Sequence, residues 1–404
     1  MYTDPVVFER ELPLVFANTW QWLGRSEQVR EPGSFVTGTV AREPVVVSRD
    51  RSGALHAFSG ACRHRGGPVA EGSGEAAALR CRYHGWTYRL DGTLLHAPAV
   101  PDATGCDLPR FHVDEWHGHL FVFLGENPPA LADVLAPVDA WSANYALDDL
   151  RFDHRDSYDL DCNWKTYIDN SQEGYHIAFV HPMLSTALDL HGYRQECDGL
   201  CTRQVAPFSI DSAGRGGADD LDLFRQISPL RHGLSGEETT ASMFINVFPN
   251  FVVNLHPDHV VTEVIEPVDA EHSRIHLDYW FDGKPSGRLG RVVRRIVGTG
   301  VTDAPSTPGG RFDQIARRAT DWATEDPPRR RVQRWFQDDL GPELARALNI
   351  YYTDQAQHED NEITAAAQRG IRAPSFTGGP LSPTREDAVA HFHDLVRQYV
   401  GQVQ

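Results

Sequence analysis

The sequence has few cysteines, no long apolar run and no excess of positive charge. Six cysteines among 404 residues are too few for a disulfide-stabilised scaffold, so a reducing cytoplasm is the simplest setting. No apolar run reaches the length of a transmembrane helix, and the N-terminus lacks the basic and apolar regions of a signal peptide. A formal net charge of −18 argues against nucleic acid or an anionic membrane as a partner.

Two further absences argue against a repeat architecture and against nucleotide binding by this chain. No internal repeat is present, and no Gly-x-Gly-x-x-Gly motif follows a predicted strand, so we expect no nucleotide-binding fold in this chain. A length of 404 residues predicts two or three domains. The short basic run Arg329–Arg331 is either a solvated helix face or a docking site for an acidic redox partner.

Hydrophobic periodicity divides the chain into three parts. Apolar residues at helical spacing over 6–22 predict an N-terminal helix, and we expect residues 1–33 to pack on the catalytic domain. Residues 34–135 alternate short β-rich runs with Gly and Asp turns, among them a hairpin at Asp91-Gly92, and predict an all-β domain. Residues 136–404 combine strands with long helices, which predicts an α+β domain.

The first candidate site combines cysteine and histidine in two short arms. Cys62-x-His64 and Cys81-x2-His84 each offer one thiolate and one imidazole, and nearby glycines suit tight loop tips. If the arms bind a two-iron cluster, the thiolates can take one iron and the imidazoles the other, which raises the potential above that of an all-cysteine cluster. Structural zinc is the alternative, but zinc sites usually pair like residues within an arm, whereas each arm here is mixed.

The second candidate site carries two carboxylates and two histidines. On a continuous helix, Asp169, Glu173 and His176 would share one face. His181 follows His176 by five residues, which is the wrong angle for that face. Because Pro182 disfavours helical geometry at His181, we expect the chain to unwind between the two histidines and to return His181 to the same metal.

A third ligand is required to complete this second site. Two histidines and one carboxylate form the facial triad of a non-haem Fe(II) oxygenase, which leaves open positions for O2. We expect Asp360, in the predicted late helix, to be the carboxylate, with Glu359 and Asp354 as alternatives. Taken alone, these residues have ordinary roles as a solvated helix face and as polar histidines. The first site favours iron, because a cluster that supplies electrons needs an acceptor.

In these motifs the chain resembles the α subunits of Rieske non-haem iron oxygenases. The resemblance covers about residues 7–400 and rests on two independent metal motifs in the right order. It is carried by the cluster motif Cys62-x-His64-Arg-Gly with Cys81-x-Tyr-His84-Gly-Trp-x-Tyr, by the iron motif Asp169-x3-Glu173-x2-His176-x4-His181, and by Glu359-Asp360.

The resemblance implies both the fold and the cofactors. The fold would be a β-rich Rieske [2Fe–2S] domain and a helix-grip catalytic domain, in which an antiparallel sheet surrounds a long helix. Cys62 and Cys81 would hold one cluster iron, and His64 and His84 the iron nearer to solvent. His176, His181 and Asp360 would hold the catalytic iron.

The resemblance also implies partners. Glu173 would link the iron to the cluster of a neighbouring subunit in a ring of three, Asp169 would orient this relay, and Asn170 would lie near the iron. Electrons would come from NAD(P)H through a separate reductase, with or without a ferredoxin.

The reaction is left open between two classes. Most of the family has aspartate where this chain has Glu173, and Asp-Asn-x-x-Glu-Gly-Tyr-His is similar to the branch that acts on choline, carnitine and glycine betaine. This favours hydroxylation or oxidative N-demethylation of a small molecule such as a quaternary ammonium compound. The alternative is hydroxylation or cis-dihydroxylation of an aromatic compound, and a stand-alone Rieske electron carrier is more distant.

Recognition of a quaternary ammonium group would need an aromatic cage. Several aromatic residues of the catalytic part can form such a cage, line a pocket for an aromatic ring, or fill the core. They are Phe244, Phe248, Phe251, Tyr279, Trp280, Phe281, Tyr351 and Tyr352.

Overall fold

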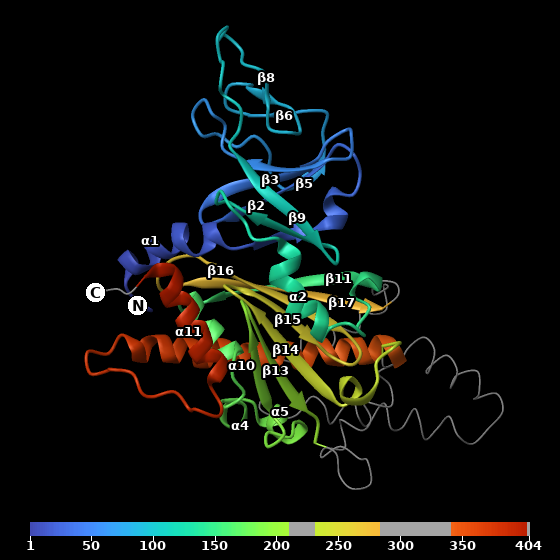
Figure 1. Ribbon diagram of the computed structural model, residues 1–404, viewed down its shortest axis with the longest axis vertical. Helices are drawn as coiled ribbons and strands as arrows, with labels where there is room; N and C mark the ends of the chain where they lie inside the picture. Colours follow the sequence, from blue (N-terminus) through green and yellow to red (C-terminus); the bar gives the residue numbers. More distant parts are fainter. Residues whose placement is uncertain (210–230, 283–340, 402–404) are drawn as a thin grey trace, which may run out of the picture.

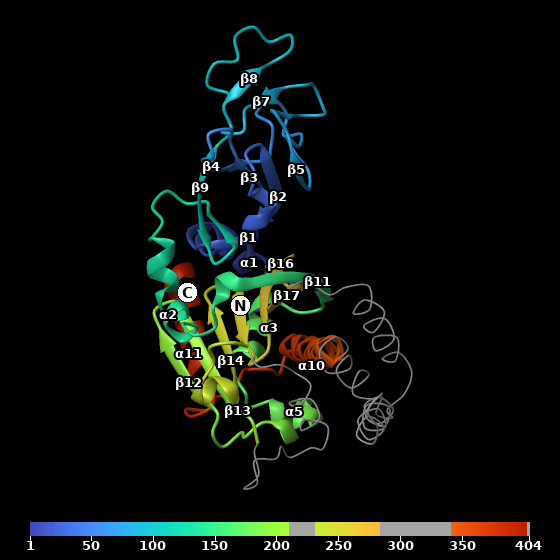
Figure 2. The same cartoon turned by 90° about the vertical axis from the view of Figure 1, so that its right-hand side faces the viewer.

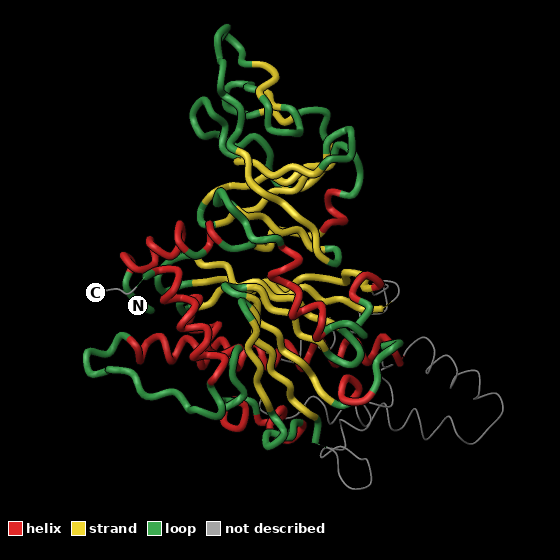
Figure 3. The backbone as a smooth tube through the Cα atoms, viewed as in Figure 1, coloured by secondary structure: helices red, strands yellow, loops and turns green. Residues whose placement is uncertain are grey.

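The computed structural model describes residues 1–209, 231–282 and 341–401, with the backbone alone for 341–352. The basic run Arg329–Arg331 lies outside these residues. One end of the molecule consists of strands and loops, and the other end is a large sheet flanked by helices (Figures 1 and 3). The predicted α+β fold, with a β-rich first domain and an antiparallel sheet beside a long helix, is confirmed.

The first half is built on a seven-stranded sheet with a three-stranded sheet beyond it. In the larger sheet the order is β1 (Gln21–Arg25), β10 (His119–Phe123), β9 (Arg110–Trp116), β4 (Leu55–Ser59), β3 (Glu43–Arg49), β2 (Ser34–Val40) and β5 (Ser73–Glu75). The smaller sheet holds β6 (Leu79–Arg80), β7 (Thr87–Tyr88) and β8 (Leu94–His96). The predicted hairpin at Asp91-Gly92 is confirmed as the β7–β8 connection, where Gly92 has a φ of 82°.

The second half is built on a seven-stranded sheet in which every neighbouring pair is antiparallel. Its order is β11 (Leu150–Leu160), β17 (Ser273–Asp282), β16 (Val260–Pro267), β15 (Phe251–Leu255), β14 (Ala241–Val247), β13 (Cys201–Pro207) and β12 (Arg194–Asp198). The strands predicted over 241–281 are therefore confirmed.

Helices cover both faces of this second sheet. The long helix α10 (Gly341–Ile371) and helix α2 (Leu131–Trp141) lie on opposite sides of it (Figure 2). The remaining helices are α1 (Pro5–Leu14), α3 (Trp164–Ser171), α4 (Ile177–Val180), α5 (Pro182–Ala187) and α11 (Asp387–Val400), with short 3-10 turns η1 (Phe16–Asn18), η2 (Ser26–Val29), η3 (Leu147–Asp149) and η4 (Gly236–Thr239). In the described part of the chain, no helix combines the length and the apolar character needed to cross a bilayer.

Alternation along β16 gives the second sheet two different cores. Val261 and Ile265 belong to the apolar cluster that contains Trp164 of α3. Val260 belongs to the cluster on the other side, which contains Leu135 of α2. Successive side chains of a strand point to opposite faces, so odd-numbered positions of β16 face α3 and α10. This face is the one that carries the second candidate site.

The N-terminal segment differs from its expected boundary. The helix ends at Leu14 rather than near residue 22, and Pro13 in its last turn removes an amide donor that would help to continue it. Phe8 of α1 packs in the core of the catalytic half, in the same cluster as Phe392. Strand β1, however, pairs with β10 in the first sheet, so the expected segment 1–33 is divided between the two halves.

Candidate functional site

The two arms of the first site form a pair of loops with the same backbone hydrogen bonds. In each loop the cysteine amide donates to a carbonyl five residues later, and a glycine amide donates back to the cysteine carbonyl. These bonds are Cys62 N to Gly67 O at 2.8 Å, Gly66 N to Cys62 O at 2.8 Å, Cys81 N to Trp86 O at 2.9 Å and Gly85 N to Cys81 O at 3.0 Å. Gly66 and Gly85 have φ values of 70° and 75°, a left-handed conformation that favours glycine.

The side chains of the first site are arranged in an inner and an outer pair. Cys62 and Cys81 are free thiols, 4% and 2% exposed, whereas His64 and His84 are exposed. The rings of the two histidines lie 4.5 Å apart between centroids. Two buried thiols beneath two exposed imidazoles fit a [2Fe–2S] cluster with one iron turned inward and the other toward solvent.

The surroundings of the first site also suit a cluster. The Tyr88 hydroxyl lies 3.3 Å from the sulfur of Cys62, which allows a hydrogen bond to a thiolate ligand. A side chain at Gly67 would place its Cβ 3.0 Å from the sulfur of Cys81, so glycine permits the close approach of the two loops. Trp86 stacks on the ring of His64, with centroids 5.1 Å apart, and thus supports an outer ligand.

The second site brings two histidines and one carboxylate together. Ligand atoms of His176, His181 and Asp360 all lie within 4.8 Å of one another. The Nε2 atoms of the two histidines are 3.2 Å apart, and Asp360 Oδ1 is 3.1 Å from that of His181 and 3.6 Å from that of His176. These three groups come from α10 and from the ends of α4.

Hydrogen bonds on the far sides of the rings show that this site fits a metal ion. His176 Nδ1 donates to Glu173 Oε1 at 2.7 Å, and His181 Nδ1 donates to Glu359 Oε2 at 2.7 Å. Each ring then presents the lone pair of its Nε2 to the other ring and to the Asp360 carboxylate. Two lone pairs and a carboxylate oxygen cannot satisfy one another by hydrogen bonding, and a cation completes such a set.

The three candidate acids of α10 have different positions, which separates the expected ligand from its alternatives. Asp360 faces both Nε2 atoms and accepts a hydrogen bond from Asn170 Nδ2 at 2.8 Å. Glu359 contacts the opposite nitrogen of His181, so it orients that ring. Asp354 lies closer to the N-terminal end of the helix, where Tyr158 donates a hydrogen bond to it.

The prediction that one helix places Asp169, Glu173 and His176 on a shared face is wrong. Helix α3 ends at Ser171, so Glu173 lies in the turn that follows, and α4 occupies the interval in which unwinding was expected. The break at His181 is present, since this residue ends α4 and precedes α5 with φ −113° and ψ 83°. A Cβ at Gly174 would lie 2.5 Å from the ring of Tyr193, so this turn leaves no room for a side chain at position 174.

Asp169 does not reach the two histidines of the second site. Its carboxylate accepts hydrogen bonds from the Tyr2 hydroxyl at 2.7 Å and from His393 Nε2 at 3.0 Å. Burial, and next the charge of Asp169, raise the pKa of Tyr2. Close by, Lys165 Nζ donates to Glu11 at 2.6 Å in a buried ion pair that joins α3 to α1. Asp169 therefore fastens both ends of the chain to α3.

The candidate aromatic residues are divided among several surroundings. Phe248, Tyr279 and Phe281 lie in the apolar cluster that faces α3, whereas Phe251 and Trp280 lie in the cluster on the other face. Phe244 packs against a small cluster that contains Ile177 of α4. The side chains of Tyr351 and Tyr352 lie outside the described residues.

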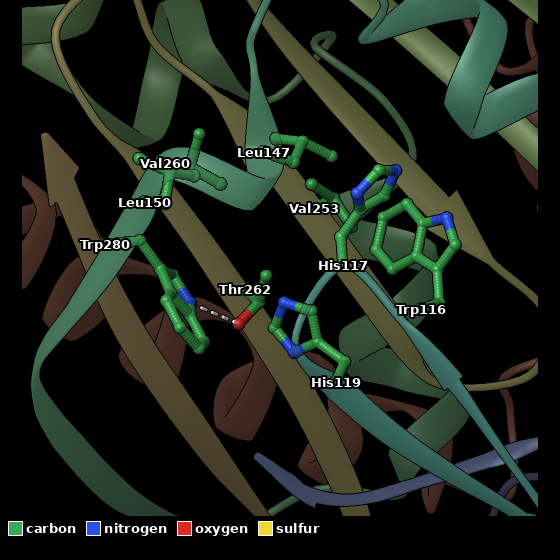
Figure 4. A pocket seen from close by; sticks show the side chains of 9 residues that line it. All are labelled: Trp116, His117, His119, Leu147, Leu150, Val253, Val260, Thr262 and Trp280. Carbon is green, nitrogen blue, oxygen red and sulfur yellow. Dashed lines mark hydrogen bonds between the residues drawn. The ribbon is translucent and has the colours of Figure 1, made fainter. Parts of the chain in front are cut away.

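A recess between the two halves lies away from the second site (Figure 4). It is lined by Trp116 and His119 of the first sheet and by Val253, Thr262 and Trp280 of the second. Those strand positions face away from α3 and α10. His119 is buried there, and burial lowers its pKa to about 3, so it is neutral near pH 7. The recess therefore belongs to the packing between the halves.

Sequence reasoning missed one buried acid on the face that carries the second site. Glu263 of β16 is 7% exposed and accepts a hydrogen bond from Asn254 Nδ2 at 2.6 Å. Burial, and next the charge of Asp360, raise its pKa to about 7. The signal in the sequence is a single glutamate at an inward position of a strand otherwise rich in valine and isoleucine, Val260–Pro267.

Two family profiles match this chain. A profile described as ring hydroxylating alpha subunit (catalytic domain) matches residues 147–402, which is more than half of the chain. A profile described as Rieske [2Fe-2S] domain matches residues 19–112. The first match contains all of the second site, and the second contains both arms of the first site.

Known proteins resemble the chain over nearly its full length. A glycine betaine monooxygenase oxygenase subunit from Chromohalobacter salexigens is 35% identical, with 97% of this chain and 83% of the relative covered. A chloroplastic choline monooxygenase from Beta vulgaris is 30% identical, with 97% and 74% covered.

Solved structures share the fold. A quaternary ammonium Rieske monooxygenase, CntA, in complex with L-carnitine has a TM-score of 0.67 and 21% identity, with 98% of this chain and 93% of that chain covered. A naphthalene 1,2-dioxygenase with bound indole has a TM-score of 0.66 and 19% identity, with 99% and 90% covered.

Proposed function

The chain belongs to the ring-hydroxylating α-subunit family of Rieske oxygenases, and from this premise we propose that it oxidises a quaternary ammonium compound with O2. The family makes the chain an oxidoreductase with a [2Fe–2S] cluster and a mononuclear iron. When bound, the cluster supplies electrons and the iron activates O2. The observation that carries the O2-activating part of the proposal is the geometry of His176, His181 and Asp360.

We assign the ligands as follows. Cys62, Cys81, His64 and His84 hold the cluster, and His176, His181 and Asp360 hold the iron. Glu173 and Glu359 keep each histidine in the tautomer whose Nε2 binds metal, and such supporting partners strengthen metal binding. Asn170 holds the Asp360 carboxylate in place through its amide.

We propose that electrons enter the iron site from a neighbouring subunit. The cluster loops around β6–β8 and the short helices α4 and α5 lie at opposite ends of the chain (Figure 1). Glu173 contacts His176, and beside it Tyr175 and Phe179 are 53% and 79% exposed. Tyr83, next to His84, is 57% exposed. Exposed aromatic side chains at both ends favour contacts between subunits, and a closed ring of three would satisfy them.

A complementation experiment tests this relay. Cys81→Ser removes the cluster from a subunit, and Glu173→Ala breaks the link to its iron, so we expect each variant alone to be inactive. When the two are co-expressed with different affinity tags and purified through both tags, an intact cluster can face an intact Glu173 across an interface. We expect activity to return in these mixed assemblies. No recovery in assemblies shown to be mixed would contradict the relay between subunits.

The substrate class is inferred from the relatives and from one sequence feature. The related oxygenases named above act on choline, carnitine or glycine betaine according to their names. Glu173 occupies the position where most of the family has aspartate, and the motif around it is similar to that of the branch that acts on choline, carnitine and glycine betaine. The aromatic alternative has the fold of naphthalene 1,2-dioxygenase in its favour, but the more similar sequences belong to quaternary ammonium enzymes.

A product screen tests the substrate class. The iron-loaded protein is supplied with NADH, a Rieske-oxygenase reductase and O2, and is offered choline, glycine betaine, carnitine and an aromatic acid in parallel. We expect oxidised product from at least one quaternary amine, with NADH consumption matched to product. The matched control is His176→Ala with the same reductase. Turnover of the aromatic acid alone would overturn the proposed class.

Two expectations from the sequence remain predictions. A separate NAD(P)H-dependent reductase is expected, with or without a ferredoxin, and adding such a reductase in the screen tests it. A cytoplasmic location also stays a prediction, since some of the plant relatives are chloroplastic.

A further inference from the structure

The face of the second sheet that carries the iron site contains a group of buried polar atoms. Glu263 of β16 and Asn254 of β15 occupy inward positions, in line with Val261 and Val252 of the apolar cluster. Tyr279 of β17 pairs with Val261 on the same face. We define the polar group as Glu263, Asn254 and Tyr279. Each is less than 10% exposed, at positions where apolar residues would pack at lower cost.

Two atoms of this polar group have no hydrogen-bond partner. Asn254 Oδ1 and the hydroxyl oxygen of Tyr279 are both buried and unpaired among the described residues. The amide nitrogen of Asn254 donates a hydrogen bond to Glu263 at 2.6 Å, so it is the amide oxygen that has no partner. An unsatisfied buried polar atom costs about 1–3 kcal/mol, and most such atoms in folded proteins are satisfied. A cluster of them on one face indicates a place where a ligand completes the contacts.

The charge of the polar group is also uncompensated. Within the described residues, no lysine or arginine forms an ion pair with Glu263, and the charged group that acts on it is Asp360, which is also negative. A buried carboxylate is normally paired with a cation or protonated. Burial, and next the carboxylate of Asp360, raise its pKa to about 7.

Two phenol groups, those of Tyr167 and Tyr279, lie on the same side of the sheet as Glu263 and within its electrostatic influence. Tyr167 of α3 donates a hydrogen bond to Gln357 of α10 at 2.8 Å, which places it on the same side of the sheet. Burial raises the pKa of both Tyr167 and Tyr279, and the charge of Glu263 contributes to each. A carboxylate near phenol groups is a chemistry that recognises a quaternary ammonium ion, which cannot donate hydrogen bonds.

We propose that Glu263 is a specificity-determining residue whose carboxylate pairs with the quaternary ammonium group of the substrate. The inference deepens the proposed function and rests on it. Asn254 holds the carboxylate in place, and the polar group selects a cation over a neutral molecule of the same shape. The attraction of a buried acid for a cation needs no hydrogen-bond donor on the ligand, and this matches a fully alkylated nitrogen.

The test compares a cation with its neutral isostere. Choline and its tert-butyl analogue, in which carbon replaces nitrogen, have nearly the same shape and differ in charge. Binding of each to the iron-loaded protein is measured by calorimetry for the wild type, for Glu263→Gln and for Glu266→Gln. Glu266 lies on the same strand but faces the other way, with its side chain 40% exposed, so it controls for the loss of one negative charge.

We expect the wild type and Glu266→Gln to prefer choline, and Glu263→Gln to lose about 30-fold in affinity for choline, in line with the loss of one partner of a buried charge pair. Affinity for the neutral analogue should be unchanged. Glu263→Asp, which keeps the charge, should retain a preference for choline and covers the case in which Glu263→Gln does not fold. If Glu263→Gln weakens both ligands equally, or neither, the inference is overturned.

The same experiment separates the inference from the proposed function. A wild type that binds neither choline nor glycine betaine nor carnitine would refute the proposed substrate class, and the inference would fall with it. A wild type that binds and oxidises one of these compounds, with Glu263→Gln equal to it in cation affinity, would refute the inference alone.

Discussion

The two candidate metal sites of this protein are assembled in different ways. In the first site, each arm closes on itself through two backbone hydrogen bonds, and its ligands are at most three residues apart. In the second site, the supporting pair His181–Glu359 joins residues that are 178 positions apart. Local spacing is therefore sufficient to recognise the first site, whereas the second exists only because α10 packs beside α3 and α4.

The two sites also differ in what surrounds their ligands. The first keeps its sulfurs buried and its imidazoles exposed, as a centre that passes electrons outward requires. The second encloses its ligands between helices and supports each ring with a carboxylate. The first site leaves its histidine ligands open to a partner, and the second holds its ligands in a fixed coordination geometry. Changes to the two sites should therefore differ in the visible spectrum and in the metal content, although both should abolish or strongly reduce turnover.

The largest effect is expected from Cys81→Ser. Loss of an inner thiolate should remove the cluster, so that the visible absorption disappears, the iron content falls from about three per chain to about one, and turnover is abolished. Visible spectroscopy and iron analysis measure this outcome. Cys106→Ser is the control, because Cys106 lies outside both arms. A variant that keeps the wild-type spectrum would contradict the ligand assignment.

His181→Ala should give the converse result. The cluster spectrum is expected to remain, while the mononuclear iron is lost and turnover falls by roughly a thousandfold or more, because a ligand of the O2 site is gone. Iron counting with a spectrum of the same sample separates this variant from Cys81→Ser. His191→Ala, an exposed histidine of the same half, should behave as the wild type. Turnover by His181→Ala would show that the iron lies elsewhere.

Glu359→Gln should have a smaller effect, confined to the second site. The amide can still contact His181 but no longer carries a charge, so we expect iron affinity to fall about 10- to 100-fold with the cluster unchanged. Competition with a chelator measures the affinity. Glu362→Gln, on the exposed side of the same helix, is the control. Equal affinities for both variants would show that Glu359 does not support the ligand.

The smallest effect is expected from Glu263→Gln, which should change how the stability of the protein depends on pH. Glu263 lies on the sheet face that carries the second site. The pKa of this carboxyl is about 7 in the folded chain against an ordinary 4.5. The carboxyl therefore stays protonated to a higher pH in the folded state than in the unfolded state. The free energy of unfolding falls as the pH rises between these two pKa values. Glu263→Gln should remove this fall and gain on the order of 1–3 kcal/mol at about pH 8, with little gain near pH 4.

Thermal unfolding of the protein without iron or substrate at several pH values measures this gain, and Glu266→Gln serves again as the control. The variant should unfold at a higher temperature than the wild type above about pH 7. A difference that is equally large at low pH would mean that packing, rather than charge, causes it.

The sequence alone determined the two metal motifs, the order of the domains and most strands of the second sheet. Cys62, His64, Cys81 and His84 could be identified because their chemistry needs fixed short spacings, and alternation in segments such as Val260–Pro267 predicts strands directly. Pro182 correctly predicted a break at His181, because its ring disfavours helical geometry at the residue before it.

Only the tertiary structure decided the remainder. The sequence favoured Asp360 over Glu359 as the ligand, but neighbours on a helix point in different directions, and only the packing of α10 sets which of the two faces the Nε2 atoms of the histidines. Helix α3 ends at Ser171, before the turn in which Gly174 packs closely against the ring of Tyr193, and β1 joins the first sheet by pairing with β10. Long-range contacts of this kind leave no periodic signal, because each depends on a partner far away in the chain.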